Sequence, residues 1–230
     1  MNHIFGRLAI GTAAWGKEYH GIQVPEDEQK RILDYCQCSG IDMIDTATAY
    51  EWDWTKVSSY FNIVSKSCSG KDLGNKSNLY AFLSHSDSVM WQPFWADTSY
   101  KIKKVGLSIY EPISIPHFGT FGVPWANLIQ VPYSIFDRRF ETYFAQLKEW
   151  NIEIHVRSIF LQGKILEKFK PWECIAFCLM NKYVDRVIIG VDSLEQLKEN
   201  LQPFHRMNSA EVHDENILDP RRWEKQNETM

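Results

Sequence analysis

The sequence contains no long hydrophobic run, and none of its apolar stretches approaches the roughly 20 residues that a membrane-spanning helix needs. Its first residues, MNHIFGRLAIG, do not place a charged segment ahead of an apolar core, as a secretory signal peptide does. These absences predict a cytoplasmic protein without a membrane partner.

An excess of basic charge is also missing. The 25 Lys and Arg residues stand against 29 Asp and Glu residues, which gives a formal net charge of −4 and a pI of about 6.0. The basic residues are scattered along the chain, whereas a protein that holds a polyanion concentrates them. We therefore expect no nucleic-acid partner.

Cysteines are few and odd in number, five in all. An odd count suits reduced thiols better than a disulfide framework. Cys174 and Cys178 are four residues apart on an expected helix, but no cluster of His or Cys lies near them in the sequence. We interpret them as small core side chains and predict no metal site.

What the sequence does contain is a set of short, strongly apolar runs bounded by turn-forming residues. The runs are continuously apolar rather than alternating, which is typical of parallel strands covered on both faces. They comprise residues 7–13, 42–47, 62–66, 79–85, 104–109, 127–133, 153–159 and 186–191.

Helix-like segments separate several of these runs. The first opens with proline and acids and closes on Gly40, and the last begins at Ser193, a favoured helix cap. Strands that alternate with helices predict an α/β fold, a (β/α)8 TIM barrel. The expected helices are residues 25–40, 137–150, 167–183 and 193–204.

The alternation is incomplete in two places. Residues 67–78 and 110–127 are rich in turn formers, so we expect several shortened crossover helices. With 230 residues and 44% hydrophobic content, the chain is long enough for one substantial core. We expect a single barrel domain over residues 1–204 and a polar C-terminal tail over residues 205–230.

Ionisable residues follow one another at the ends of the predicted strands. The second run ends near Asp45, the third on Lys66 and the fourth on His85, while Tyr50 lies in the loop after the second. Because the carboxyl ends of barrel strands open onto one face, these four side chains should converge there.

Such a cluster can perform acid catalysis. A buried ammonium needs the carboxylate beside it, and a phenol next to that ammonium is easier to ionise. Tyr50 could then give a proton to a carbonyl oxygen, with His85 as a second donor. Each residue alone is more often a turn, a solvated end or a satisfied polar group, so a purely structural charge network remains the alternative.

Together with their surroundings, these residues resemble the aldo-keto reductases, which are (β/α)8 enzymes that reduce aldehydes and ketones with NADPH. The resemblance covers nearly the whole chain and is closest to small bacterial members, although this chain is shortened. It rests on GTAAWG (11–16), IDTATAY (44–50), IVSK (63–66), FLSH (82–85), KVGLSIY (104–110), LIQVPYSIFDRR (128–139), VRSIFLQGKIL (156–166), VIIGVDSLEQLKENL (187–201) and ILDPRRW (217–223).

The resemblance implies a role for each residue of the cluster. Tyr50 would be the proton donor, Lys66 would lower its pKa, Asp45 would hold Lys66, and His85 would orient the carbonyl. The positions that match the family's cofactor site are Ser108 and Gln130 for the nicotinamide amide, Ser158 and Gly163 for the pyrophosphate, and Gly190, Gln196, Glu199 and Asn200 for the adenosine end.

Three departures from the family pattern concern the cofactor and the loop after Tyr50. Ile109 follows Ser108 where the family usually carries Asn, and Glu51 follows Tyr50 where Gly is common. The segment IIGVDS has no cation for a 2′-phosphate. These departures predict weaker cofactor binding with little selectivity between NADPH and NADH.

The leading hypothesis is therefore an NAD(P)H-dependent oxidoreductase that reduces a small-molecule aldehyde or ketone. A sugar-type carbonyl compound is one candidate substrate. The alternative is a catalytically degenerate barrel that binds a nucleotide or a partner. A metal-dependent hydrolase is disfavoured, because only His85 and His155 are candidate ligands and His155 lies in mid-strand. The sequence specifies neither the substrate nor the oligomeric state.

Overall fold

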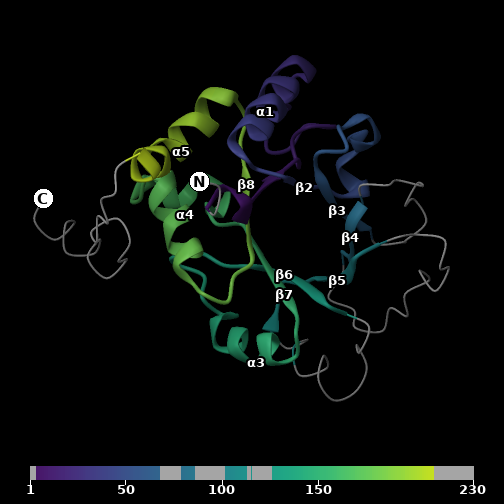
Figure 1. The fold of residues 1–230 in the computed structure, drawn as a ribbon, viewed down its shortest axis with the longest axis vertical. Coiled ribbons are helices and arrows are strands. Elements are labelled where there is room, and N and C mark those ends of the chain that lie inside the picture. Colours follow the sequence, from purple (N-terminus) through teal and green to yellow (C-terminus); the bar gives the residue numbers. More distant parts are fainter. Residues whose placement is uncertain (1–3, 68–78, 86–101, 113–114, 116–125, 210–230) are drawn as a thin grey trace, which may run out of the picture.

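Eight parallel strands form a closed barrel in chain order, as the sequence predicts (Figure 1). The structure is a computed structural model, and it describes residues 4–67, 79–85, 102–112, 115 and 126–209. Each strand falls within or overlaps one predicted run. The strands are β1 (Leu8–Gly11), β2 (Met43–Asp45), β3 (Asn62–Ser67), β4 (Leu79–Ser84), β5 (Lys104–Ser108), β6 (Leu128–Pro132), β7 (Glu153–Arg157) and β8 (Arg186–Gly190).

The helices lie outside this barrel (Figure 1). The described α-helices are α1 (Glu26–Ser39), α3 (Phe144–Glu149), α4 (Pro171–Met180) and α5 (Leu194–Ser209). Shorter 3-10 segments are η1 (Phe5–Arg7), η2 (Thr48–Tyr50), η3 (Trp54–Lys56), η6 (Glu141–Tyr143) and η7 (Leu161–Glu167). Over the part of the chain that the structure describes, none of these helices is long and apolar enough to cross a membrane.

The crossover between β2 and β3 holds only η2 and η3, so it is shortened, although the sequence pattern predicts the shortened crossovers at residues 67–78 and 110–127. The segment expected to be one helix over residues 137–150 is a turn, then η6, then α3. The turn-rich stretches 67–78 and 110–127 lie mostly outside the described residues. Helix α5 continues to Ser209, and residues 210–230 of the expected tail are likewise not described.

Alternation along each strand divides the side chains into two layers. The outward side chains of β7, Ile154 and Val156, belong to the large apolar cluster that the helices cover. A smaller cluster fills the inside of the barrel and includes Ala9, Met43, Val64, Leu83 and Leu128. Packing on both faces explains why the strand sequences are continuously apolar.

The amino-terminal ends of the strands carry a polar network of their own. The Glu153 carboxylate accepts a hydrogen bond from the Tyr80 hydroxyl at 2.8 Å, contacts His155 Nε2 at 2.7 Å and lies 3.5 Å from the Lys104 ammonium. Burial alone would raise the pKa of Glu153, but these partners outweigh burial and lower that pKa to about 2.

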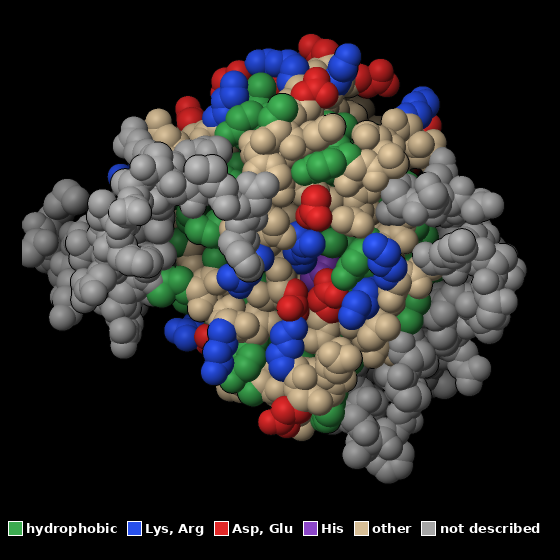
Figure 2. Space-filling model, viewed as in Figure 1, with side chains coloured by type: hydrophobic (Ala, Val, Ile, Leu, Met, Phe, Trp, Pro, Cys, Tyr) green, Lys and Arg blue, Asp and Glu red, His purple; other side chains and the backbone are tan. Residues whose placement is uncertain are grey.

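Acidic and basic side chains are interspersed on the face shown in Figure 2.

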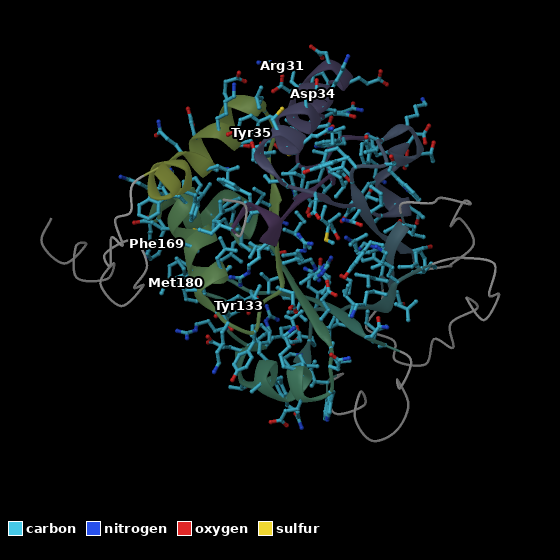
Figure 3. The ribbon with its side chains drawn as sticks, in the orientation of Figure 1. Arg31, Asp34, Tyr35, Tyr133, Phe169 and Met180 are labelled. Carbon is cyan, nitrogen blue, oxygen red and sulfur yellow. The ribbon has the colours of Figure 1, made fainter. Side chains whose placement is uncertain are left out.

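Helix α1 presents charged side chains to solvent. Arg31 and Asp34 project from α1 away from the barrel (Figure 3), and both are exposed. Tyr133, directly after β6, is buried instead, with its ring stacked on Phe177 of α4 at a centroid distance of 5.2 Å. Its hydroxyl donates a hydrogen bond to Glu141 at 2.7 Å, so its polar end is satisfied.

Candidate active site

The structure brings the four side chains of the expected cluster together at the carboxyl end of the barrel. Asp45 ends β2, Lys66 lies at the end of β3, His85 directly follows β4, and Tyr50 ends η2. The Lys66 ammonium is bonded to Asp45 and lies over the Tyr50 ring, 5.6 Å from its centroid. The rings of Tyr50 and His85 meet edge to face, with centroids 6.4 Å apart.

Lys66 and Asp45 form a buried ion pair, with side-chain exposures of 1% and 6%. Burial lowers the pKa of Lys66, and the negative charge of Asp45 opposes that effect. Removing either partner would leave an uncompensated charge in the barrel, so the pair is kept as a unit.

The effect of this pair on Tyr50 differs from our expectation. We predicted that the Lys66 ammonium would lower the pKa of the phenol, but the pKa of Tyr50 is raised, mainly by burial and then by the charge of Asp45. Arg157 opposes the rise. Because Asp45 lies beside Lys66, the pair offers the phenol little net positive charge. Tyr50 is therefore held as a protonated phenol.

His85 is held in its neutral form. Burial lowers its pKa, and the positive charges of Lys66 and then Arg157 lower it further, against the opposing charge of Asp45. A neutral imidazole can still donate one hydrogen bond. The cluster thus offers two donors that remain uncharged at neutral pH.

The backbone around Tyr50 is tightly held. The Thr48 hydroxyl donates to the Lys66 carbonyl at 3.3 Å and ties η2 to β3. A side-chain carbon on Gly16 would lie 2.3 Å from the Tyr50 carbonyl oxygen, so only glycine fits there. Glu51 has a φ of 58°, a left-handed conformation that favours glycine. This explains why glycine would suit position 51, where our chain has Glu.

A chain of hydrogen bonds crosses the mouth of the barrel and ends at Asp45. Arg157 Nε donates to the Ser108 hydroxyl at 3.4 Å, and that hydroxyl donates to Gln130 Oε1 at 3.3 Å. Gln130 Nε2 then donates to Asp45 Oδ2 at 2.6 Å. The chain therefore links β7, β5, β6 and β2, and at Asp45 it meets the ion pair with Lys66 of β3.

Sequence analysis missed Arg157. Its guanidinium stacks on the Tyr110 ring at 3.9 Å and donates to the Ile109 carbonyl at 3.1 Å and to the Ser158 hydroxyl at 3.3 Å. The available signal was the one used for Lys66, a cation at the carboxyl end of a strand. We had extended the strand to residue 159, which hid this position.

Two glycines expected to lie in the cofactor site, Gly163 at the pyrophosphate and Gly190 at the adenosine end, leave open space at the same end of the barrel. Gly190 ends β8, Gly163 lies in η7 with a φ of 86°, and a side-chain carbon on either would meet no atom within 4 Å. Ser158 directly follows β7 and is exposed. These open positions fit a dinucleotide that approaches the backbone closely.

Apart from Gly190, the expected adenosine end is less open. Ser193 caps α5 by accepting a hydrogen bond from the Gln196 amide at 3.1 Å, and Gln196 Oε1 accepts one from the Asp192 amide at 2.7 Å. The Leu194 amide is bonded to the Glu28 carboxylate. An acid of α1 thus sits where a phosphate at the helix N-terminus would bind. Of the remaining expected residues, Glu199 is exposed and Asn200 is buried.

A cavity of about 740 Å³ lies elsewhere, outside the barrel between α1 and the shortened β2–β3 crossover. Its walls include Trp15, Trp52 and Phe61. None of the strand-end side chains Asp45, Lys66, His85 and Arg157 lines it. We place the candidate site at the barrel mouth, where the ionisable groups converge.

Metal chemistry has no obvious centre in the described residues, where no three His, Cys, Asp or Glu side chains are grouped to hold an ion. Cys174 and Cys178 are both buried and free. The Cys178 thiol donates to the Tyr133 carbonyl at 3.6 Å, in the core beneath α4. This placement agrees with their interpretation as core side chains.

Comparison with solved structures identifies the architecture. Aldo-keto reductase AKR11C1 from Bacillus halodurans, in its holo form, superposes with a TM-score of 0.69 over 95% of this chain and 91% of that chain, at 17% sequence identity. The fold is that of the aldo-keto reductases. MGS-M4, an aldo-keto reductase enzyme from a Medee basin deep-sea metagenome library, gives 0.61 at 14% identity and covers 94% of this chain and 90% of its own.

A variant of Gox0644 that was crystallised in complex with NADPH shares this aldo-keto reductase fold with a TM-score of 0.56, at 16% identity over 86% of this chain and 83% of that chain. No protein-family model and no curated protein sequence matches the chain.

Proposed function

We propose that the protein is an aldo-keto reductase that uses NAD(P)H to reduce an aldehyde or ketone, with Tyr50 as proton donor. The observation that carries the proposal is the buried Lys66–Asp45 pair beneath Tyr50, with His85 beside the same ring. A purely structural pair would not require two neutral hydrogen-bond donors at its open side.

The chemistry follows from the protonation states of these groups. As negative charge develops on a carbonyl oxygen, a phenol within hydrogen-bond reach can transfer its proton to that oxygen. The raised pKa of Tyr50 keeps the proton available at neutral pH. His85 can donate a second hydrogen bond and so fix the orientation of the carbonyl. Lys66 keeps the Asp45 charge compensated while the proton leaves Tyr50.

NAD(P)H, when bound, supplies the hydride for the carbonyl carbon. Ser108 and Gln130 offer a hydroxyl and an amide for the nicotinamide carboxamide, and both are already linked to Asp45 through hydrogen bonds. The open backbone at Gly163 supports binding of the pyrophosphate, and the open backbone at Gly190 supports binding of the adenosine end. This donor set suits a nicotinamide dinucleotide.

We further propose that the site does not select for the 2′-phosphate of NADPH. The Glu28 carboxylate bonded to the Leu194 amide would repel a phosphate at the start of α5. Its partner Arg31 is shared with Glu195, so that cation is already neutralised. NADH and NADPH should therefore bind with similar affinity.

The test is a fluorescence titration with NADPH and NADH, followed by an assay for cofactor oxidation over a panel of aldehydes, ketones and sugars. Saturable binding together with turnover of at least one carbonyl compound is expected. If neither NADPH nor NADH binds, the proposal is refuted.

A second candidate is a nucleotide-binding protein without turnover. It is favoured by Gln130, which is fully buried and committed to Asp45 and Ser108, so a nicotinamide amide would have to compete for it. Cofactor binding without turnover of any compound in the panel would favour this candidate.

A further inference from the structure

The mouth of the barrel carries more positive than negative charge. Among the described side chains that converge there, Lys66 and Arg157 are cations, whereas Asp45 is an anion bonded to Lys66. His85 adds no positive charge at neutral pH, because its pKa is lowered. The uncompensated charge is therefore that of Arg157.

No carboxylate neutralises Arg157 within the described part of the chain. Its hydrogen bonds go to two hydroxyls and a carbonyl, those of Ser108, Ser158 and Ile109. The nearest acid in sequence to its stacking partner Tyr110 is Glu111, and Glu111 is paired with Arg139 at 2.9 Å. Arg139 also pairs with Asp137, so the charge of Arg139 is balanced by carboxylates, whereas that of Arg157 is not.

Arg157 is also fixed in place. Half-buried, it stacks on Tyr110 and is hydrogen-bonded to Ser108 at the end of β5 and to the Ile109 carbonyl just beyond it, so it cannot swing into solvent without losing these contacts. Its partner Ser108 is one of the two residues proposed above to hold the nicotinamide carboxamide. A nicotinamide ring in this mouth would lie close to a fixed guanidinium.

We propose that Arg157 makes the site bind reduced nicotinamide dinucleotides more tightly than oxidised ones. The inference rests on the proposed function. The dihydronicotinamide ring is uncharged, whereas the oxidised ring is a pyridinium with one positive charge, and the phosphates of the two forms are the same. Two like charges within a few ångströms in a partly buried site repel strongly enough to shift affinity about tenfold or more. Arg157 thus favours release of the oxidised cofactor after turnover.

The test compares dissociation constants of NADPH and NADP⁺, and of NADH and NAD⁺, by isothermal titration calorimetry. In the wild type, the oxidised form of each pair should bind at least about tenfold more weakly. Arg157→Met should reduce this ratio by about tenfold, and Arg157→Gln should do the same while keeping a donor for Ser108. Arg157→Lys should preserve most of the ratio.

Arg139→Met is the matched control, because it removes an arginine that is bonded to the Tyr110 carbonyl but is already paired with acids. Its ratio should equal that of the wild type. A wild-type ratio near one, or a ratio unchanged in both Arg157→Met and Arg157→Gln, would overturn the inference while leaving cofactor binding intact. Absence of binding by all four nucleotides would instead refute the proposed function and the inference with it.

Discussion

The Lys66 ammonium lies over the face of the Tyr50 ring while its ion pair is made with Asp45. The ammonium therefore interacts with the ring as a cation over a π system, and its charge is largely neutralised by the ion pair with Asp45. Stabilisation of a phenolate is weak in this arrangement, which agrees with the raised pKa of Tyr50. Tyr50 is suited to give a proton to substrate and unsuited to act as a base at neutral pH.

Replacement of Tyr50 by Phe should remove the proton donor and keep the ring. The rate of carbonyl reduction should fall about 10²–10⁴-fold, the usual contribution of general acid catalysis. Among the described residues the Tyr50 hydroxyl has no hydrogen-bond partner, so the melting temperature should barely change. Cofactor dissociation constants should also stay the same. Reduction by Tyr50→Phe at the wild-type rate would show that another group supplies the proton.

Replacement of Lys66 by Met should destabilise the barrel, because it leaves the buried Asp45 carboxylate without its cation. The expected loss in the free energy of unfolding is about 3–5 kcal/mol, measured by urea denaturation. The double variant Asp45→Asn with Lys66→Met removes both charges and should recover much of this loss. Equal stabilities of the single and double variants would mean that the charge pair is not the cause.

Replacement of Gly16 by Ala should disturb catalysis without touching any ionisable group. The added carbon would lie 2.3 Å from the Tyr50 carbonyl oxygen and 2.3 Å from the Glu51 carbonyl carbon, so the Tyr50 segment must move. Because a displacement of about 1 Å can reduce rate about 10²-fold, kcat should fall by roughly 10-fold to 100-fold. Gly6→Ala is the control, since a carbon added there meets nothing within 4 Å. Wild-type kcat in Gly16→Ala would contradict this account.

Glu153 should make the barrel sensitive to acid. In the unfolded chain its carboxyl group takes up a proton near its usual pKa of 4.5, whereas in the folded state the pKa is about 2. Between these values the unfolded state binds more protons, so stability is fully present above about pH 5 and is lost as pH falls toward 2. The free energy of unfolding of Glu153→Gln should depend less on pH in this range.

The measurement is urea denaturation of the wild type and Glu153→Gln at several values between pH 6 and pH 3, with exposed Glu149→Gln as control. The stability difference between wild type and Glu153→Gln should shrink as pH falls. A constant difference across this range would exclude Glu153 as a source of the acid sensitivity.

The eight strands and the convergence of four side chains could be predicted from the sequence, because continuous apolar runs and strand ends are local patterns. The four side chains are those of Asp45, Tyr50, Lys66 and His85. The position of Arg157 at the end of β7 could not be predicted, since the boundary between strand and loop in EIHVRSI depends on where hydrogen bonding to the neighbouring strand stops. The sign of the Tyr50 pKa shift depends on burial, which only the assembled barrel determines.

The obstruction of the expected phosphate position could not be predicted from local sequence either. Glu28 and Leu194 are 166 residues apart, and their contact depends on how α1 and α5 pack. A capping serine before a helix indicates an anion site in isolation, but an acid from another helix can fill it.

Strand β7 carries Glu153, His155 and Arg157 on its inward face and Ile154 and Val156 on its outward face. If the register of β7 shifted by one residue, the three ionisable side chains would be buried in the apolar layer under the helices. The two aliphatic side chains would then point into the barrel. Such a mispaired barrel would be far higher in free energy. The alternation of ionisable and aliphatic side chains in this strand therefore specifies the alignment of β7 with its neighbours.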